Sequence, residues 1–361
     1  MTSSIEALLT EWDGEAVATR YDADHGAYMF IGVHSTILGP TAGGTRIKVY
    51  PRPADGLADC MRLAEAMTFK FAVAGLEAGG GKAVLAVPEI PTGAAKRDLL
   101  LRYADLIETL NGTYRTGPDM NTTQADMDVI GERTRHVFGR SPENGGCGSS
   151  APDTAVGVYH GIQASCAHVF GSGALTGRTV LVQGLGGVGR VLVDLLARDG
   201  AKLLVADVDA GRVAEVVQEL GAVAVPPDEV IGTECDVFAP CATGGVLDAT
   251  TIPRLRCPIV AGAANNQLAE RADANRLTGA GILYAPDFVI NSGGALHLFG
   301  LELLNWSTSE LAGKLAGIGD TLGEIYTRAS EHGTSTEEAA EAIARARIEA
   351  ARRQHRPHRT W

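Results

Sequence analysis

The stretch TVLVQGLGGVGRVLVDLLARDGAKLLVAD (residues 179–207) decides the fold of the second half of the chain. The apolar run TVLVQ leads directly into GLGGVG, a helical pattern follows over 187–199, and a second apolar run, KLLVAD, closes the stretch. A strand, a glycine-rich turn, a helix and another strand in this order are typical of a βαβ unit. The alternation continues through a helical pattern over 210–220 and the apolar runs CDVFAP, CPIVAGA and GILYAP. We therefore expect an α/β domain with a doubly wound parallel sheet over residues 139–329.

The glycines of GLGGVG predict a Rossmann-type site for a dinucleotide. Gly184 permits a tight turn, and Gly186 lets backbone N–H groups approach a pyrophosphate at the N-terminus of the next helix. Asp207 lies 18 residues beyond Gly189, where a carboxylate accepts from a ribose 2′-hydroxyl and repels a 2′-phosphate. This favours NAD, although Arg212 nearby leaves NADP open, and a glycine turn that binds nothing is the other alternative. The candidate cofactor residues are Gly184, Leu185, Gly186, Gly187, Val188, Gly189, Asp207 and Arg212, with Ala242 after the run CDVFAP.

Composition and charge exclude several classes of protein. The 361 residues suffice for two domains, and the formal charge of −12 argues against a nucleic-acid partner, because phosphate binding requires a basic surface. No apolar run approaches the ~18 residues that span a bilayer, and the acidic start lacks the regions of a signal peptide, so we expect a cytoplasmic protein without a membrane partner. The six cysteines form no CxxC pair and no zinc-like Cys/His cluster, which predicts free thiols and no metal site.

The first 138 residues predict a mixed α/β domain. Alternating residues on both sides of a turn predict a β-hairpin over 17–33. Apolar residues at helical spacing predict a helix over 57–71. The segment AGLEAGGGK (74–82) then breaks the helix into a flexible glycine loop, and AVLAV (83–87) is the next strand.

The boundary between the domains is expected in SPENGGCGSSAP (141–152), where a hinge would create a cleft. The chain ends in two helical patterns, one with apolar residues over 311–325 and one that begins at the capping box Thr334–Glu337. We expect the C-terminal helix, about 330–361, to pack back on the first domain. Its basic segment, Arg345–Arg359, is expected to be a solvated helix end.

Two lysines flank the expected glycine loop, Lys70 at the end of the helix and Lys82 at the mouth of the strand. A lysine is ordinarily a solvated surface charge, yet both lie in apolar or glycine-rich surroundings. A lysine acts as a base near neutral pH only if its pKa falls from about 10.4 by roughly two to three units, through burial and a neighbouring cation. We expect Lys82 to be such a base and Lys70 to be the neighbouring cation, which would also hold a substrate carboxylate.

Asp119 lies between Pro118 and a loop rich in Thr and Asn, and taken alone it would be a turn aspartate. Together with the lysines it belongs to a series of motifs. In chain order these are GPTAGGTR (39–46), MTFK (67–70), GGGK (79–82), TGPDMNT (116–122), GLGGVG (184–189), AGAANN (261–266) and APDFVINSGG (285–294). Over nearly the whole chain this order resembles the glutamate/leucine/phenylalanine/valine dehydrogenase family, most closely its phenylalanine-acting members from actinobacteria.

The resemblance implies a role for each matching residue. Lys82 is implied as the catalytic base, and Asp119 as the group that moves protons to and from the substrate amino group. Lys70 is implied to bind the substrate carboxylate, Gly44 to lie against the substrate, and Asn265 to lie near both the substrate and the nicotinamide. Further residues implied near the cofactor are Thr154 and Asn291, and near the substrate Gly117, Pro118, Ala42, Ala295 and Leu298, whereas Asn121 and Ser292 depart from common family residues and receive no role.

The implied reaction is NAD-dependent, reversible oxidative deamination of a hydrophobic L-amino acid to its 2-oxo acid, ammonium and NADH, carried out by a homo-oligomer. A glutamate enzyme would have a lysine in place of Ala42 and a hydroxyl in place of Leu298. Because Gly117 and Ala295 are small, they are expected to leave volume for a large side chain, which favours L-phenylalanine as substrate and phenylpyruvate as product. A leucine or valine dehydrogenase and a catalytically silent NAD-binding regulator are the alternatives.

Overall fold

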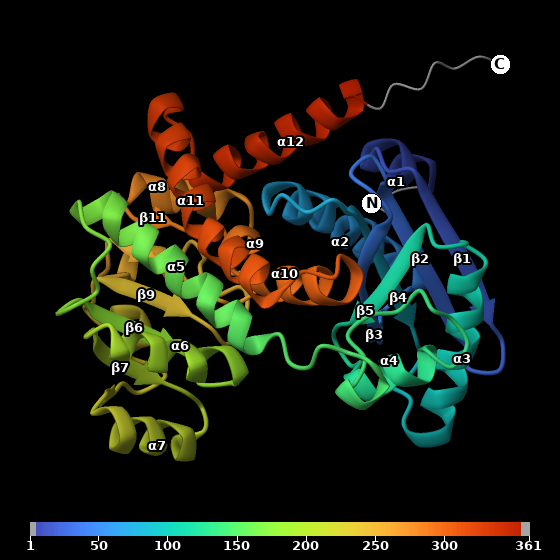
Figure 1. Ribbon diagram of the computed structural model, residues 1–361, viewed down its shortest axis with the longest axis horizontal. Coiled ribbons are helices and arrows are strands. Elements are labelled where there is room, and N and C mark those ends of the chain that lie inside the picture. Colours follow the sequence, from blue (N-terminus) through green and yellow to red (C-terminus); the bar gives the residue numbers. More distant parts are fainter. Residues whose placement is uncertain (1–4, 355–361) are drawn as a thin grey trace. The chain divides into compact units, whose positions relative to one another are not determined.

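The computed structural model describes residues 5–354, which divide into two compact units (Figure 1). Within these residues, the first unit comprises 5–148, 302–304 and 344–354, and the second comprises 149–301 and 305–343. The division after Gly148 falls inside the segment 141–152 in which we expected the hinge, and it lies beyond the expected boundary at 138. No helix within residues 5–354 is both long and apolar enough to cross a bilayer.

The described part of the first unit contains a five-stranded mixed sheet. Its strand order is β1 (Ala16–Asp22), β2 (Ala27–Ser35), β4 (Gly79–Ala86), β3 (Thr41–Lys48) and β5 (Tyr114–Pro118). The pairs β1–β2 and β2–β4 are antiparallel, whereas β3 runs parallel to both β4 and β5. The expected hairpin over 17–33 is thus β1 and β2.

The two faces of this sheet carry different helices. The helices of this unit are α1 (Ile5–Trp12), α2 (Pro53–Val73), α3 (Gly93–Glu108) and α4 (Gln124–Ile130), with a 3₁₀ turn at Pro142–Asn144. On β2, Met29 and Ile31 belong to a buried cluster with Tyr103 of α3, whereas Phe30 packs with Cys60 of α2. This alternation follows from the two-residue period of a strand. The sheet therefore lies between α2 on one face and α3 on the other.

The predicted flexible loop before Lys82 is wrong. Gly79, Gly80 and Gly81 are the first residues of β4, and Lys82 lies inside the strand. A Cβ atom on Gly80 would lie 2.1 Å from the Oγ1 atom and 2.2 Å from the backbone nitrogen of Thr68 in α2. These glycines are needed because α2 and the neighbouring backbone approach β4 closely, so they permit tight packing rather than motion.

The described part of the second unit contains a six-stranded parallel sheet. Its strand order is β11 (Leu283–Tyr284), β10 (Ile259–Val260), β9 (Val237–Pro240), β6 (Thr179–Gln183), β7 (Lys202–Ala206) and β8 (Val223–Ala224). This is the order of a doubly wound Rossmann sheet, with its reversal between β6 and β9. The predicted fold class, a mixed-sheet domain and a Rossmann domain, is confirmed.

The helices of the second unit follow the expected alternation with the strands. The helices α6 and α7 match the predicted spans 187–199 and 210–220 to within one residue. The full set is α5 (Ala151–Phe170), α6 (Gly187–Arg198), α7 (Ala210–Leu220), α8 (Ala272–Gly279), α9 (Asp287–Ile290), α10 (Gly293–Leu298), α11 (Thr308–His332) and α12 (Thr336–Gln354), with 3₁₀ turns at Val230–Gly232 and Ile252–Arg254 and a π-helical segment, Phe299–Leu303, that continues from α10. The last residues of this segment and the second half of α12 belong to the first unit.

The start of α12 differs from the prediction by one residue. The backbone N–H of Ser335 donates to the carboxylate of Glu338 (3.1 Å), and the N–H of Glu338 donates to Ser335 Oγ (3.3 Å). The capping box is therefore Ser335–Glu338 rather than Thr334–Glu337. Both pairs fit the same pattern of residue types, so the sequence alone does not separate them.

The expectation of a solvated helix end is corrected only in part, because Arg345 and Arg347 of α12 contact α2, whereas Arg352 and Arg353 in its last turn are exposed. Arg347 donates to the backbone carbonyls of Ala72 (3.0 Å) and Val73 (2.5 Å) at the end of α2. The guanidinium of Arg345 lies 4.7 Å from the ring centroid of Phe69. These contacts lie within the first unit, and residues 355–361 of the predicted basic segment lie outside the described part of the chain.

Candidate active site

Strand register brings three charged residues of the first unit together. In the parallel pairing of β3 with β4, Arg46 stands opposite Val84, two residues along from Lys82. In the pairing of β3 with β5, Thr45 stands opposite Pro118, so Asp119 follows next to Arg46. Side chains on neighbouring parallel strands at the same register point to the same face of a sheet. Lys82, Arg46 and Asp119 therefore meet although they are far apart in the sequence.

The side chains of Lys82 and Arg46 converge on one oxygen atom of Asp119. Lys82 Nζ lies 2.7 Å from Asp119 Oδ2, and Arg46 Nε lies 3.1 Å from the same atom. Lys82 is only 6% exposed, whereas the Asp119 side chain is 26% exposed. The site is a buried amine held by a carboxylate that still reaches solvent.

Burial lowers the pKa of Lys82 below its ordinary value of 10.5, and the charge of Arg46 lowers it further, while Asp119 opposes both. For Asp119, burial would raise the carboxyl pKa, but Lys82 and Arg46 outweigh burial and hold that pKa below 3.8. The predicted mechanism of the shift at Lys82, burial plus a neighbouring cation, is therefore present. The cation identified by these contacts is Arg46, whereas we had named Lys70, which is half-buried in the last turn of α2.

Arg46 is the residue that the sequence analysis missed. Its Nη1 donates to Asp59 Oδ2 (2.9 Å), which also accepts from Tyr50 Oη (2.6 Å), while the other oxygen of Asp59 accepts from Arg62 (2.7 Å). A signal was available, because Arg46 ends the motif GPTAGGTR. That Arg46 contacts Asp119 became clear only from the register of β3 against β5.

Two predicted substrate residues on β3 lie where side chains must be small. A Cβ atom on Gly44 would lie 2.6 Å from the carbonyl oxygen of Pro118 and 2.8 Å from Asp119 Cβ, so glycine at this position lets the Asp119 loop approach. Ala42 is 1% exposed and pairs with Gly80 on one side and Arg115 on the other.

The inference that Gly117 leaves volume for a large substrate side chain is wrong. A Cβ atom on Gly117 would lie 2.2 Å from Cε2 of the Phe138 ring, which is buried. Phe138 already fills the space that the missing side chain leaves. Asn121, to which we gave no role, has a φ of 62°, a conformation that asparagine tolerates, and its amide donates to the Ile47 carbonyl (2.9 Å).

The predicted dinucleotide residues of the second unit gather where the strand order reverses. Gly184 follows β6 with a φ of 99°, and a Cβ atom on it would lie 2.8 Å from Cβ of Ala242, which follows β9. A Cβ atom on Gly189 would lie 1.9 Å from the Gly184 carbonyl oxygen, whereas one on Gly186 would meet no atom within 4 Å. The turn is therefore tightly packed at Gly184 and Gly189. At Gly186, the N-cap residue of α6, it leaves free space, which a bound pyrophosphate requires.

Asp207 is held at the end of β7 in a way that suits a ribose. Its carboxylate accepts from the backbone N–H groups of Leu185 (2.6 Å) and Asp209 (2.8 Å), one on each oxygen, and each oxygen keeps a further lone pair for a hydroxyl. Burial raises the pKa of Asp207, but these hydrogen bonds outweigh burial and lower it, so the group is anionic at neutral pH. Arg212 lies 3.4 Å from the Asp209 carboxylate. These residues fit NAD.

The remaining predicted residues of the second unit lie around α5, α9 and α10. Asn291 donates from its amide to Asn265 Oδ1 (2.7 Å), which joins two of the sequence motifs. Thr154 donates to the Ser150 carbonyl (2.9 Å) within α5. Ala295 and Leu298 lie on α10 and are partly buried. Within residues 5–354 no group of three or more His, Cys, Asp or Glu side chains is arranged to hold a metal ion, and the cysteines are free.

Two family models match the chain. The Glu/Leu/Phe/Val dehydrogenase dimerisation domain matches residues 17–136, and Glutamate/Leucine/Phenylalanine/Valine dehydrogenase matches residues 202–356. The chain belongs to this family. The family consists of NAD(H)-dependent amino acid dehydrogenases, so the predicted family and cofactor are confirmed, and the chain is an enzyme of this class.

Several relatives cover almost the whole chain. Leucine dehydrogenase of Geobacillus stearothermophilus is 40% identical over 96% of this chain and 94% of its own. Valine dehydrogenase of Streptomyces albus is 41% identical over 94% and 93%. L-Tryptophan dehydrogenase of Nostoc punctiforme is 42% identical over 90% of both chains, and its crystal structure matches this one with a TM-score of 0.86 at 37% identity, over 96% of this chain and 98% of that chain. These relatives do not support phenylalanine as the substrate, and the leucine or valine alternative fits them better.

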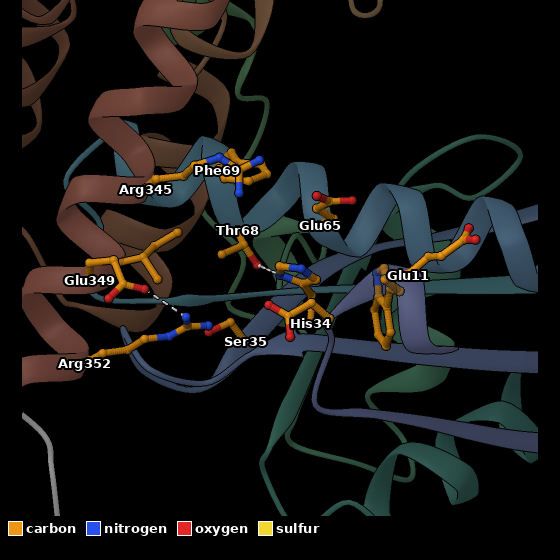
Figure 2. Close-up of a pocket in the computed structure, with 12 residues that line it drawn as sticks. Glu11, His34, Ser35, Glu65, Thr68, Phe69, Arg345, Glu349 and Arg352 are labelled. Atoms are coloured by element: carbon orange, nitrogen blue, oxygen red, sulfur yellow. Dashed lines mark hydrogen bonds and ion pairs between the residues drawn. The ribbon is translucent and has the colours of Figure 1, made fainter. Parts of the chain in front are cut away.

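A separate polar pocket lies elsewhere in the first unit (Figure 2). It has a volume of about 350 Å³ and is lined by residues of α1, β2, α2 and α12, not including Lys82 or Asp119. Inside it His34 Nδ1 lies 2.8 Å from Thr68 Oγ1, and burial lowers the pKa of this histidine, which favours its neutral form. Figure 2 shows Arg352 directed to Glu349, at 2.9 Å. Because its lining includes neither Lys82 nor Asp119, we assign this pocket no part in the reaction.

Proposed function

We propose that this enzyme catalyses the NAD-dependent, reversible oxidative deamination of an aliphatic L-amino acid such as leucine or valine to the corresponding 2-oxo acid. The observation that carries the proposal is the buried Lys82 amine, 2.7 Å from the Asp119 carboxylate, because a desolvated lysine beside a proton acceptor is equipped for base catalysis. The names of the leucine and valine relatives supply the substrate class.

The residues of the site argue against an acidic substrate. Ala42 and Leu298 offer no charge or hydroxyl to a side-chain carboxylate, which would cost several kcal/mol to bury unpaired. Of the two small residues that favoured phenylalanine, Gly117 and Ala295, Gly117 leaves no free volume, because Phe138 occupies it. The leucine and valine relatives therefore support the aliphatic candidate.

In the mechanism, Gly184–Gly189 and Asp207 would hold NAD⁺, which when bound would accept the hydride of the substrate α-carbon. Lys70 binds the substrate carboxylate, and its fixed charge orients the amino acid. Asp119 takes a proton from the substrate amino group, and loss of hydride leaves an iminium carbon. Lys82, as a neutral amine, accepts a proton from water, whose oxygen bonds to that carbon. Asp119 returns its proton to the carbinolamine nitrogen, the C–N bond breaks as the C=O bond of the 2-oxo acid forms, and the released ammonia takes up the hydroxyl proton and leaves as ammonium. Lys82 then releases its proton to solvent.

The test is an initial-rate comparison of leucine, valine, isoleucine, phenylalanine and tryptophan, each with NAD⁺ and with NADP⁺. We expect kcat/KM for leucine or valine with NAD⁺ to exceed that for phenylalanine by about tenfold or more, since a difference of a single methylene group in an apolar pocket already discriminates by roughly 1–3 kcal/mol. A higher value for an aromatic amino acid would overturn the assignment of substrate. NADH binding without NADH formation from any amino acid would instead favour the silent regulator.

We also propose that the chain self-associates. The family model that matches residues 17–136 describes a dimerisation domain, and a structurally similar glutamate dehydrogenase from Thermus thermophilus (25% identity, TM-score 0.73) is a hetero-hexamer. Light scattering after size-exclusion chromatography would give a mass above the 37.6 kDa of one chain. A monomer at micromolar concentration would contradict this proposal.

A further inference from the structure

Lys82 and Arg46 share one acceptor, and this sharing is the starting observation. Both nitrogen atoms lie within hydrogen-bonding distance of Asp119 Oδ2, at 2.7 Å and 3.1 Å. The two cationic groups are therefore less than about 6 Å apart, a separation at which like charges oppose each other's ionisation. Asp119 alone would stabilise the charged form of Lys82, so Arg46 offsets part of that effect.

Arg46 is fixed in place from its other side. Its side chain is 13% exposed, and its Nη1 atom binds Asp59, whose side chain is 15% exposed and also accepts from Tyr50. A guanidinium has several N–H donors in a planar fork, so it can bridge two carboxylates, whereas a single ammonium group lacks this geometry. The carboxylate of Asp119 is thereby held toward Lys82 by a group that never loses its charge.

We propose that Arg46 is a positioning residue that holds the Asp119 carboxylate against Lys82 and, through its permanent positive charge, favours the neutral amine that base catalysis requires. This inference rests on the proposed function, in which Lys82 is the base. It concerns a residue that does not itself need to touch the substrate.

The other ionisable groups at this site leave Lys82 as the group that titrates in the alkaline range. Burial raises the pKa of Cys60, whose Sγ lies 3.3 Å from the Lys82 carbonyl, to about 12. Burial also raises the pKa of Tyr50. Burial would raise both carboxyl pKa values as well, but Lys82 and Arg46 hold the pKa of Asp119 below 3.8, and hydrogen bonds from Tyr50 and Arg62 together with the charge of Arg46 do the same for Asp59. The groups that face Lys82 or Arg46 from β3, α2 and the segments after β3 and β5 are Arg46, Asp59, Cys60, Tyr50 and Asp119.

The experiment measures kcat for deamination against pH in the intact enzyme and in Arg46→Met. Removal of the cation should move the ascending limb of the profile to higher pH by about one unit, which lowers kcat about tenfold at pH values below the limb. The matched control is Arg62→Met, because Arg62 binds the other oxygen of Asp59 and is 59% exposed. Its profile should stay within about 0.2 units of wild type.

A second substitution, Arg46→Lys, separates charge from geometry and covers the case in which Arg46→Met does not fold. The lysine keeps a positive charge, so the ascending limb of the kcat profile should stay within about 0.3 pH units of its wild-type position. Its single nitrogen cannot reproduce the contacts that Nε and Nη1 of Arg46 make to Asp119 and Asp59, so kcat should fall by about fivefold or more, while Arg62→Lys keeps wild-type kcat. Thermal unfolding identifies folded variants.

The proposal is overturned if folded Arg46→Met has the wild-type pH profile, or if Arg46→Lys has the wild-type kcat. It is also overturned if Arg46→Lys shows the same shift of the limb as Arg46→Met, since the charge would then not be the cause. A wild-type enzyme that deaminates no amino acid would mean that the proposed function fails. If only this inference fails, the wild type is active and the Arg46 variants have the same dependence of kcat on pH as the wild type.

Discussion

At the scale of single residues, the site depends on Lys82 being buried next to a carboxylate that keeps some contact with solvent. A fully desolvated lysine without Asp119 would be neutral but badly oriented, and a lysine paired with an exposed carboxylate would stay protonated. The 6% exposure of Lys82 and the contact at 2.7 Å place it between these limits. Two substitutions test the two parts of this arrangement.

Lys82→Ala should lower kcat for deamination by roughly 10²- to 10⁴-fold, the usual contribution of a positioned acid or base. NADH affinity, measured by fluorescence titration, should stay within about twofold of wild type, because the dinucleotide residues lie in the second unit. Lys202→Ala, at an exposed lysine that begins β7, is the control and should leave kcat unchanged. Wild-type turnover in Lys82→Ala would remove this lysine from the mechanism.

Asp119→Asn should move the ascending limb of the plot of kcat against pH to lower pH, whereas Arg46→Met is expected to move it to higher pH. The Asp119 carboxylate raises the pKa of Lys82 through its charge and its hydrogen bond. Its loss lowers that pKa further, so the neutral amine forms at lower pH and the limb shifts down by about one unit. Maximal kcat falls, because the amide cannot accept the substrate proton. A limb at the wild-type pH or above would show that another group titrates.

The residues of the candidate site differ in how far the sequence could predict them. Lys82 was found because a charge in glycine-rich, apolar surroundings is unusual, whereas Asp119 received its role only from the resemblance of its motif to the family. Arg46 was not, because its contact with Asp119 spans 73 positions and exists only through the parallel register of β3 and β5. Gly117 was misinterpreted for a related reason, since Phe138 reaches it from a segment beyond α4. Tertiary neighbours of this kind leave no local pattern.

At the scale of elements, β4 and α2 approach so closely that glycine is required between them. The spacing of apolar residues along the sequence was enough to predict most helices and strands, including α6 and α7. The periods did not show whether Gly79–Gly81 belong to a loop or a strand, because glycine fits both and its reason here is the neighbouring helix. The two-residue strand β8 was not predicted, and unlike the equally short β10 it has two exposed residues.

Gly80→Ala should destabilise the protein by about 1–3 kcal/mol, the usual cost of inserting a methyl group into a packed contact. The clash involves the backbone nitrogen of Thr68, which cannot rotate away as a side chain can. Gly313→Ala is the control, since this glycine is exposed in α11 and its Cβ would meet no atom. That variant should gain about 0.5–1 kcal/mol. Urea denaturation followed by circular dichroism measures both, and equal stability of the two variants would contradict the packing argument.

At the scale of the whole molecule, the chain does not simply pass from one unit to the other. After the second unit it returns to the first through α12, whose residues beyond Ile343 belong to the first unit. The expectation that the C-terminal helix packs on the first domain agrees with this assignment only for the second half of the helix. Its contacts there are made by Arg345 and Arg347.

Arg347→Met tests whether this return stabilises the first unit. Arg347 donates to the carbonyls of Ala72 and Val73 at the end of α2, where the last carbonyls have few backbone donors, although the Ala72 carbonyl also accepts from the Gly75 N–H (3.2 Å). Its loss should cost about 1–3 kcal/mol and speed amide hydrogen exchange over residues 53–86, while NADH affinity stays at the wild-type value. Arg353→Met, at an exposed arginine in the last turn of α12, should change neither. If exchange accelerated equally over β6 and α6, the arginine would stabilise the protein as a whole, and its assignment to the first unit would be wrong.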